Sequence, residues 1–244
     1  MGVRWIKLDR VDSTNRYLAG LLKREELRDE VVIIADYQES GRGQGNNRWH
    51  SNSGENLLMS VLLFPVFLSA SSQFYLSRAV SLALCDLLHA FHIRSRIKWP
   101  NDIMTGRGKI AGILIEHGVT GQSLTHSIAG IGLNLNQTLF PPFEVPATSL
   151  RLETGMVEDP GRMAEMLHGY LQQRLKQLID GSFEKMDREY LDLLYRVGET
   201  SLFISGNRSF QGIITGVNEY GELLVNEGDI TQAYGFHAIK FSGY

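Results

Sequence analysis

The stretch from Gln73 to Phe91 places the strongest constraint on the fold. It is apolar nearly all round, and its length suits a helix rather than a strand. Such a helix is stable only when other elements cover most of its surface, so the chain must build a domain around it. Arg78, Asp86 and His89 interrupt the apolar run, which argues against a membrane span. With 244 residues, 43% of them hydrophobic, the chain has enough apolar material for that core.

The elements around this helix mix strands with amphipathic helices. The β-branched run Val31–Tyr37 predicts a buried strand. A capped helix is expected to begin at Asp12, another at Asp159-Pro160, and a third to run from Glu184 to Val197. Further strands are expected at Asn56–Phe64, Arg96–Trp99, Lys109–Glu116 and Ile128–Leu135. Together these elements predict an α+β domain.

The character of the chain changes near Gly198. From Thr200 onward the segments are short and β-rich, and turn signals separate them at Gly206-Asn207, Tyr220-Gly221 and Glu227-Gly228. Hairpins at this spacing favour a small β-barrel. We therefore expect two domains, covering residues 1–196 and 197–244.

Composition excludes several classes of protein. The net charge is −3, which argues against a large nucleic-acid footprint. The single cysteine, Cys85, rules out an internal disulfide framework, and its apolar neighbours indicate a buried thiol. No H-E-x-x-H pair and no G-x-S-x-G element occur, so neither zinc nor serine-hydrolase chemistry has support. The first residues have no apolar signal segment, and a cytoplasmic location is expected.

A glycine-rich loop, S-G-R-G-Q-G-N-N-R-W, runs from Ser40 to Trp49. Its glycines let backbone amides converge on a ligand, Arg42 and Arg48 add positive charge for carboxylate or phosphate, and Trp49 offers a flat face for a base. The loop lacks the G-K-[ST] ending of a Walker A motif, and a strand rather than a helix follows it. Taken alone, an ordinary surface turn explains it as well.

Two further segments carry charge to the ends of strands. In K-W-P-N-D, Lys98 to Asp102, the proline ends a strand and leaves a carboxylate that suits Mg²⁺ against phosphate oxygens. In G-K-I-A-G-I-L-I-E, Lys109 begins an apolar strand, so its ammonium is expected at the rim of the sheet. A simple proline turn and a solvated lysine are the alternatives for these segments in isolation.

Two polar segments complete the set. G-I-G-L-N-L-N, Gly130 to Asn136, has two glycines inside a strand, which is unfavourable unless something approaches the backbone closely. D-S-T-N, Asp12 to Asn15, offers hydroxyls and free helix amides to a small polar group. A β-bulge explains the first segment equally well, and simple helix capping explains the second.

Taken together, these motifs resemble the biotin protein ligase family. D-S-T-N, Y-Q-E-S-G-R-G, W-x-S-x-x-G-x-N-L, K-W-P-N-D, K-I-A-G-I-L-I-E and G-I-G-L-N-L-N run in family order between Asp12 and Asn136. Each motif is weak alone, but six in order are specific, and the resemblance spans nearly the whole chain. It implies a mixed β-sheet with helices on one side, like the class II aminoacyl-tRNA synthetases, followed by an SH3-like C-terminal barrel.

The resemblance also implies a two-step reaction with biotin and ATP as substrates and Mg²⁺ as the metal. Biotin is first activated to biotinyl-5′-AMP and is then transferred to a lysine of a biotin carboxyl carrier domain in a carboxylase. Catalytic roles would fall to Lys109, Arg42 and Asp102, with Asp102 as the candidate Mg²⁺ ligand. The substrate-binding residues implied are Ser13, Thr14, Asn15 and Gln38 for the biotin ring; Gly112, Gly130 and Gly132 for the biotin tail; Trp49 and Asn134 for adenine; and Gly41, Arg42, Gly43, Gln44, Lys98, Asn101 and Lys109 for the loop, carboxylate and phosphates.

The chain departs from the family pattern in two ways. Gln44 and Asn47 stand where the best-known form of the loop has arginines, and glutamine carries no charge. In addition, D-S-T-N begins at Asp12, where some members first have a DNA-binding winged helix. We therefore expect an enzyme with no repressor role and no DNA partner, and a sequence-specific operator shift in a gel assay would contradict this.

Three alternatives stay open at this point. A lipoate–protein ligase of related fold uses the same adenylate chemistry. A non-catalytic biotin-binding module would lack charge at Lys109 or Arg42, and both residues are present. A DNA-binding regulator is the third. Members of the family dimerise to different extents, so a homodimer is also possible.

Overall fold

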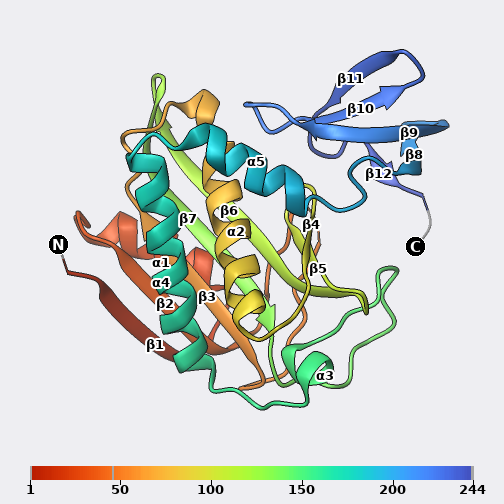
Figure 1. Ribbon diagram of the computed structural model, residues 1–244. Helices are drawn as coiled ribbons and strands as arrows, with labels where there is room; N and C mark the ends of the chain where they lie inside the picture. Colours follow the sequence, from red (N-terminus) through yellow and green to blue (C-terminus); the bar gives the residue numbers. More distant parts are fainter. Residues whose placement is uncertain (1, 46, 243–244) are drawn as a thin grey trace.

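The computed structural model describes residues 2–45 and 47–242. Its larger sheet has the strand order β1-β2-β3-β7-β6-β5-β4 (Figure 1). β1 and β2 pair in parallel, and the other neighbours pair antiparallel, so the sheet is mixed. The strands are β1 (Arg4–Val11), β2 (Val31–Gln38), β3 (Asn56–Leu63), β4 (Arg96–Lys98), β5 (Asp102–Met104), β6 (Lys109–Thr120) and β7 (Ser123–Asn134).

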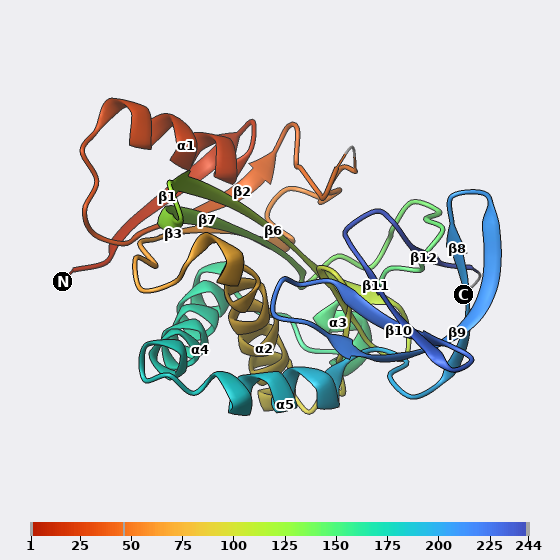
Figure 2. The ribbon, with the colours of Figure 1, turned by 90° about the horizontal axis from the view of Figure 1, so that it is seen from above.

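Helices cover both faces of this sheet (Figure 2). The apolar helix α2 packs against α4 and lies with it on one face. α1 lies on the opposite face, where Leu18 and Leu21 form a separate core with Val31, Ile33 and Leu62. The helices are α1 (Thr14–Arg24), α2 (Phe74–Ala90), α3 (Leu150–Thr154), α4 (Pro160–Ile179) and α5 (Phe183–Leu193), with a short 3₁₀ helix at Ala70–Ser72.

The expected α+β class is confirmed, with one correction. The expectation that helices lie on one side holds for α2, α4 and α5 but is wrong for α1. The reason lies in β2, where Val32 joins the main core while its neighbours Val31 and Ile33 join the core under α1. Because successive strand residues point to opposite faces, a continuous apolar run gives both faces something to bury.

A second, five-stranded antiparallel sheet follows, with the order β11-β10-β9-β8-β12. An isolated bridge between Val197 and Ile214 marks its start. The apolar core nevertheless continues from α2 into this sheet through Phe203 and Val225, among others. The division into residues 1–196 and 197–244 therefore stays a proposal. The strands are β8 (Thr200–Ser205), β9 (Arg208–Val217), β10 (Leu223–Glu227), β11 (Ile230–Tyr234) and β12 (Lys240–Phe241).

The second sheet is attached to α2 and to the segment after β4 through a turn between β9 and β10. The Arg78 side chain, 3% exposed, donates from Nη2 to the carbonyl oxygens of Val217 and Asn218, both at 2.9 Å. Trp99 Nε1 donates to the carbonyl oxygen of Gly221 at 2.9 Å. Charge-assisted bonds from a buried arginine are costly to break, so this contact fixes the second sheet beside β4.

Among the described residues, none of the helices combines the length and apolar character needed to cross a lipid bilayer.

Candidate active site

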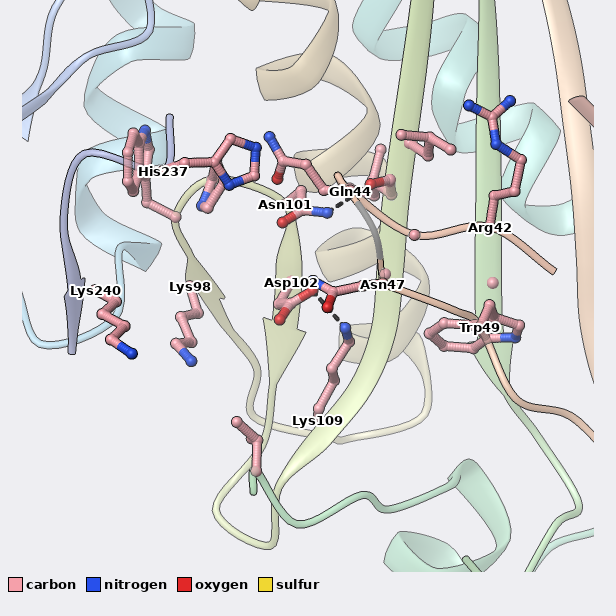
Figure 3. A pocket seen from close by; sticks show the side chains of 18 of the residues that line it. Arg42, Gln44, Asn47, Trp49, Lys98, Asn101, Asp102, Lys109, His237 and Lys240 are labelled. Carbon is pink, nitrogen blue, oxygen red and sulfur yellow. Dashed lines mark hydrogen bonds and ion pairs between the residues drawn. The ribbon is translucent and has the colours of Figure 1, made fainter. Parts of the chain in front are cut away.

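A cavity of about 510 Å³ opens between the two sheets (Figure 3). Its walls come from the start of α1, the loop after β2, the β4–β5 turn, the start of β6, the glycine segment of β7, and the segment leading to β12. This volume lies within the range of small-molecule sites in proteins. Segments far apart in the sequence therefore meet at one place.

The cavity gathers nearly all the residues expected from the sequence. It is lined by Ser13, Thr14, Asn15, Gln38, Arg42, Gly43, Gln44, Trp49, Lys98, Asn101, Asp102, Lys109, Gly112, Gly130 and Gly132. Gly41 and Asn134 do not line it. Gly41 supports the loop from behind, since a Cβ there would lie 2.6 Å from the Trp49 carbonyl oxygen. Asn134 is 3% exposed, and its Nδ2 donates to the Thr148 carbonyl oxygen at 2.9 Å.

A hydrogen-bond network builds one polar end of the cavity. Gln38 Oε1 accepts from the backbone N–H of Thr14 at 2.8 Å and from its hydroxyl at 3.1 Å. The buried Ser60 hydroxyl is 2.6 Å from Thr14 Oγ1 and 2.7 Å from Asn15 Oδ1. Ser13 stands at the N-cap position of α1 but makes no side-chain capping bond. Helix capping alone therefore does not account for D-S-T-N, because these side chains are held in place by other elements.

The other end of the cavity carries paired charges. Lys109 Nζ lies 2.6 Å from Asp102 Oδ1, with side-chain exposures of 29% and 20% (Figure 3). Arg42 Nη1 lies 2.9 Å from Glu116 Oε1 on β6, and Glu116 Oε2 accepts from Asn15 Nδ2 at 2.8 Å, so this second pair lies beside the polar end. Asn101 Nδ2 donates to the Ile113 carbonyl oxygen at 2.8 Å. Lys109 and Arg42 thus each start with an acidic partner within the protein.

Trp49 lies directly on two of the strand glycines. A Cβ at Gly132 would come within 2.4 Å of the indole Cε2, and one at Gly112 within 3.0 Å of Cζ3. Lys109 Nζ lies 5.7 Å from the centroid of the Trp49 ring. The third glycine, Gly130, faces Asn15, whose Oδ1 would be 2.3 Å from an added Cβ. The glycines in β6 and β7 therefore make room for side chains of the site, which explains their presence inside strands.

Several lining residues were not expected from the sequence. Asn47 and Glu144 line the cavity from loops, while His237 and Lys240 reach it from the second sheet. His237 and Lys240 carry no motif, and they lie more than a hundred positions beyond the motif residues. No local sequence pattern predicts that these two residues line the cavity, because they reach it only when the second sheet packs beside the first.

The pKa of Lys98 is shifted by its position in the cavity. Burial lowers the pKa of Lys98 to about 8, with the Asp102 charge opposing the shift and the Lys109 charge adding to it. Below that pH the side chain carries its charge, and above it the charge is lost. The cavity therefore offers a full set of cations only up to about pH 8.

We expect the affinity for inorganic tripolyphosphate to fall more steeply in the wild type than in Lys98→Arg between about pH 7 and about pH 9, because arginine stays charged throughout that range. Calorimetric titration at constant ionic strength measures this, and the probe's own ionisation cancels in the comparison. Identical slopes for the two proteins would show that Lys98 does not titrate there.

The described residues hold no group of three or more His, Cys, Asp and Glu side chains arranged for a metal ion. Asp102 is one carboxylate within the cavity, and Mg²⁺ is commonly bound by one or two carboxylates together with substrate phosphates. The donor set thus suits a cation that arrives with a phosphate ligand.

A polar end held by buried hydrogen bonds and a charged end facing an aromatic ring together define a site for a small molecule with an anionic group. The comparisons with known proteins identify the class. Residues 8–134 match the model of the Biotin/lipoate A/B protein ligase family, and the chain belongs to that family.

Individual relatives narrow the identification. The chain is 30% identical to the biotin--[acetyl-CoA-carboxylase] ligase of Paracoccus denitrificans over 225 residues, which cover 89% of this chain and 92% of the relative. It is also 30% identical to the ligase of the same name from Mycobacterium tuberculosis, over 94% of this chain and 87% of the relative. Within the family, the chain therefore belongs with the biotin--[acetyl-CoA-carboxylase] ligases and is an enzyme of that kind.

The solved structures agree with the fold. The biotin protein ligase of Aquifex aeolicus in complex with biotin and ATP superposes with a TM-score of 0.81 at 25% identity, and the match covers 99% of both chains. Both sheets of this protein are included in that match.

Proposed function

We propose that the protein activates biotin with ATP and transfers it to a lysine of a carboxylase carrier domain. In the first step, a biotin carboxylate oxygen attacks the α-phosphorus, the bond to the bridging oxygen breaks, and pyrophosphate leaves. In the second, the carrier amine attacks the acyl carbon, the acyl–phosphate bond breaks, and AMP leaves. The observation that carries this proposal is Lys109, a cation placed between the polar end and the cluster of Lys98 and Asp102.

The polar end suits the biotin ring. A ureido group has one carbonyl oxygen and two N–H donors, so it needs both donors and acceptors. Thr14, Asn15 and Gln38 provide both kinds from a network that Ser60 holds rigid. Ser13 lines the same end. We assign the ring to these residues because a preorganised polar site loses little entropy on binding.

The charged end suits the carboxylate and the phosphates. Lys109 Nζ is paired with Asp102, so an arriving anion competes with Asp102 for the ammonium. Asp102 would hold Mg²⁺, which would neutralise part of the phosphate charge. Preorganised cations aimed at a reacting phosphoryl group account for most of the rate enhancement in such reactions. Lys98 and Asn101 are assigned to the phosphates on the same grounds. Arg42 is assigned a phosphate contact as well, although here it is paired with Glu116 beside the polar end.

Trp49 is the proposed adenine contact, since its ring faces the cavity. It covers Gly112 and Gly132, and Asn15 covers Gly130, so we assign the biotin tail to the part of the cavity between Asn15 and the indole. Asn134 is assigned an indirect role: it anchors the Thr148 segment beneath the site, because its amide already bonds that segment.

The loop glutamine leads to a specific prediction. Gln44 lines the cavity but is uncharged, so Lys109 and Arg42 are expected to hold the adenylate. Gln44→Ala should therefore raise the rate of biotinyl-AMP release by less than about threefold, since a neutral hydrogen bond contributes little net energy. A stopped-flow chase with unlabelled biotin measures the rate. A rise of tenfold or more would show that the glutamine side chain itself retains the adenylate.

The matching family model also covers lipoate ligases, which makes lipoate activation the second candidate. The short polar end with two kinds of hydrogen-bonding groups favours a ureido ring over a dithiolane, which has no N–H or C=O to satisfy. ATP–pyrophosphate exchange decides between them. Exchange that depends on biotin supports the proposal, and exchange that depends on lipoate alone would replace it.

A further inference from the structure

His237 lies outside all the sequence motifs, and its backbone has a positive φ. His237 lies between β11 and β12 and lines the cavity. Its φ is +66°, in the left-handed region. That conformation is strained for a residue other than glycine. Glycine would avoid this strain, so the backbone conformation alone does not account for a histidine here.

Aromatic side chains of α2 and of the segment after β4 pack against the segment that carries His237. Its neighbour Phe236 packs on the Trp99 ring, with centroids 5.5 Å apart, and on the Phe74 ring at 6.1 Å. Trp99 also bonds Gly221, at the turn that attaches the second sheet. Trp99 is the residue next to Lys98 in K-W-P-N-D. The segment that carries His237 is therefore packed against the segment that carries Lys98.

The imidazole lies against the tip of the glycine-rich loop. In that loop the Gly43 N–H donates to the Asn47 carbonyl oxygen at 2.8 Å, and Arg42 forms a bridge with Arg48. Gly45 stands at the tip of the loop with a φ of +63°, and a Cβ there would lie 3.3 Å from His237 Cε1. Figure 3 shows His237 reaching toward the loop that carries Gln44. The second sheet thus meets the loop through this ring.

We propose that His237 is a positioning residue for ATP: it holds Gly45 of the loop beside the second sheet, which keeps the neighbouring Gln44 facing the triphosphate. This inference rests on the proposed function. The side chains on either side of the contact support it, because Gln44 precedes Gly45 and Lys240 lines the cavity on the same side as His237. A loop held at Gly45 keeps Gln44 directed toward the triphosphate, whereas a loop released there does not.

His237→Gly tests this without endangering the fold, because glycine adopts the observed φ without strain. We expect its unfolding temperature to equal or exceed that of the wild type. We expect the KM for ATP in biotin-dependent exchange to rise about tenfold, with the Kd for biotin alone unchanged. His237→Asn, which tolerates the left-handed region and keeps a donor, should recover part of the loss.

His92 offers a matched control. It is also a histidine with a left-handed backbone, with a φ of +59°, and it does not line the cavity. His92→Gly should gain stability in the same way and leave the KM for ATP unchanged.

Trypsin gives a readout that does not depend on turnover. It cleaves after Arg42 and Arg48 in the loop, and ATP with biotin should slow these cuts in the wild type and in His92→Gly but much less in His237→Gly. A wild-type ATP KM and full protection in His237→Gly would overturn the inference. So would an equal loss of biotin and ATP binding with a lowered unfolding temperature, since that pattern marks a purely structural role. Absence of biotin-dependent exchange in the wild type would instead overturn the proposed function.

Discussion

Replacing Lys109 by glutamine is expected to lower biotin-dependent ATP–pyrophosphate exchange by on the order of a hundredfold or more. Lys109 is the cation proposed to lie between the carboxylate and the α-phosphate, and removing one preorganised group of that kind from a transition state costs about that much. Glutamine keeps an N–H donor on this side chain but removes the positive charge opposite Asp102. The loss should therefore appear in kcat for exchange more than in the Kd for biotin.

Two variants separate this effect from a general loss of charge. Lys176→Gln removes a surface lysine that pairs with Asp180 four residues away, and it should leave exchange unchanged. The double variant Lys109→Gln with Asp102→Asn removes both members of the ion pair. If it recovered activity, the role of Lys109 would be to neutralise Asp102 rather than to act on substrate, and the assignment would be wrong.

The second large effect is expected at Gly132. In Gly132→Ala the new Cβ would overlap the Trp49 ring at 2.4 Å, so the indole must leave the strand surface and move into the cavity. Overpacking of this kind typically costs about 1–3 kcal/mol. Because the displaced ring occupies substrate space, we expect adenylate formation to fall at least tenfold, which single-turnover formation of labelled biotinyl-AMP would measure.

Gly118 provides the control for Gly132. It lies on β6, in the same pair of strands, and its Cβ would displace the His126 ring at a similar distance, 2.1 Å, at the far end of the hairpin. Gly118→Ala should lower the unfolding temperature without changing the KM for ATP or for biotin. If both alanine variants lost stability and activity to the same extent, the effect of Gly132 would be one of folding alone.

Much of the fold was predictable because its signals are local. The apolar run around α2 and the β-branched run of β2 fall where the sequence places them. β1 was missed because it is an edge strand whose residues are mostly exposed or half-buried, so it has no clear alternation of apolar and polar positions. Its parallel pairing with β2 is a tertiary contact that no local pattern encodes.

The C-terminal end of α5 was also predicted wrongly, because a tertiary contact determines it. The amphipathic pattern predicts a helix to Val197, but α5 ends at Leu193. Leu194 forms a bridge with Ile97, and Tyr195 N–H donates to the Ile97 carbonyl oxygen at 2.9 Å. Pairing with β4 thus competes with the helix and prevails, as tertiary contacts commonly do over propensity.

In the site, too, the residues within local motifs were predictable, and their partners from distant segments were not. The motifs indicated the residues of the first domain because each combines unusual residue types within a few positions, such as Gly-Arg-Gly at Gly41. The partners of those residues were hidden: Glu116 opposite Arg42, Ser60 beneath Thr14, and His237 against the loop. Each of these contacts joins residues at least 46 positions apart, so only the folded chain reveals them.

The central claim, that this cavity joins biotin to a protein through an adenylate, has a direct test. The purified protein is incubated with biotin, Mg-ATP and an apo carrier domain of a biotin-dependent carboxylase, and the carrier is then probed with streptavidin. We predict label on one carrier lysine that requires ATP and is lost in Lys109→Gln. An unlabelled carrier in the presence of all components, with the wild-type protein folded, would contradict the account.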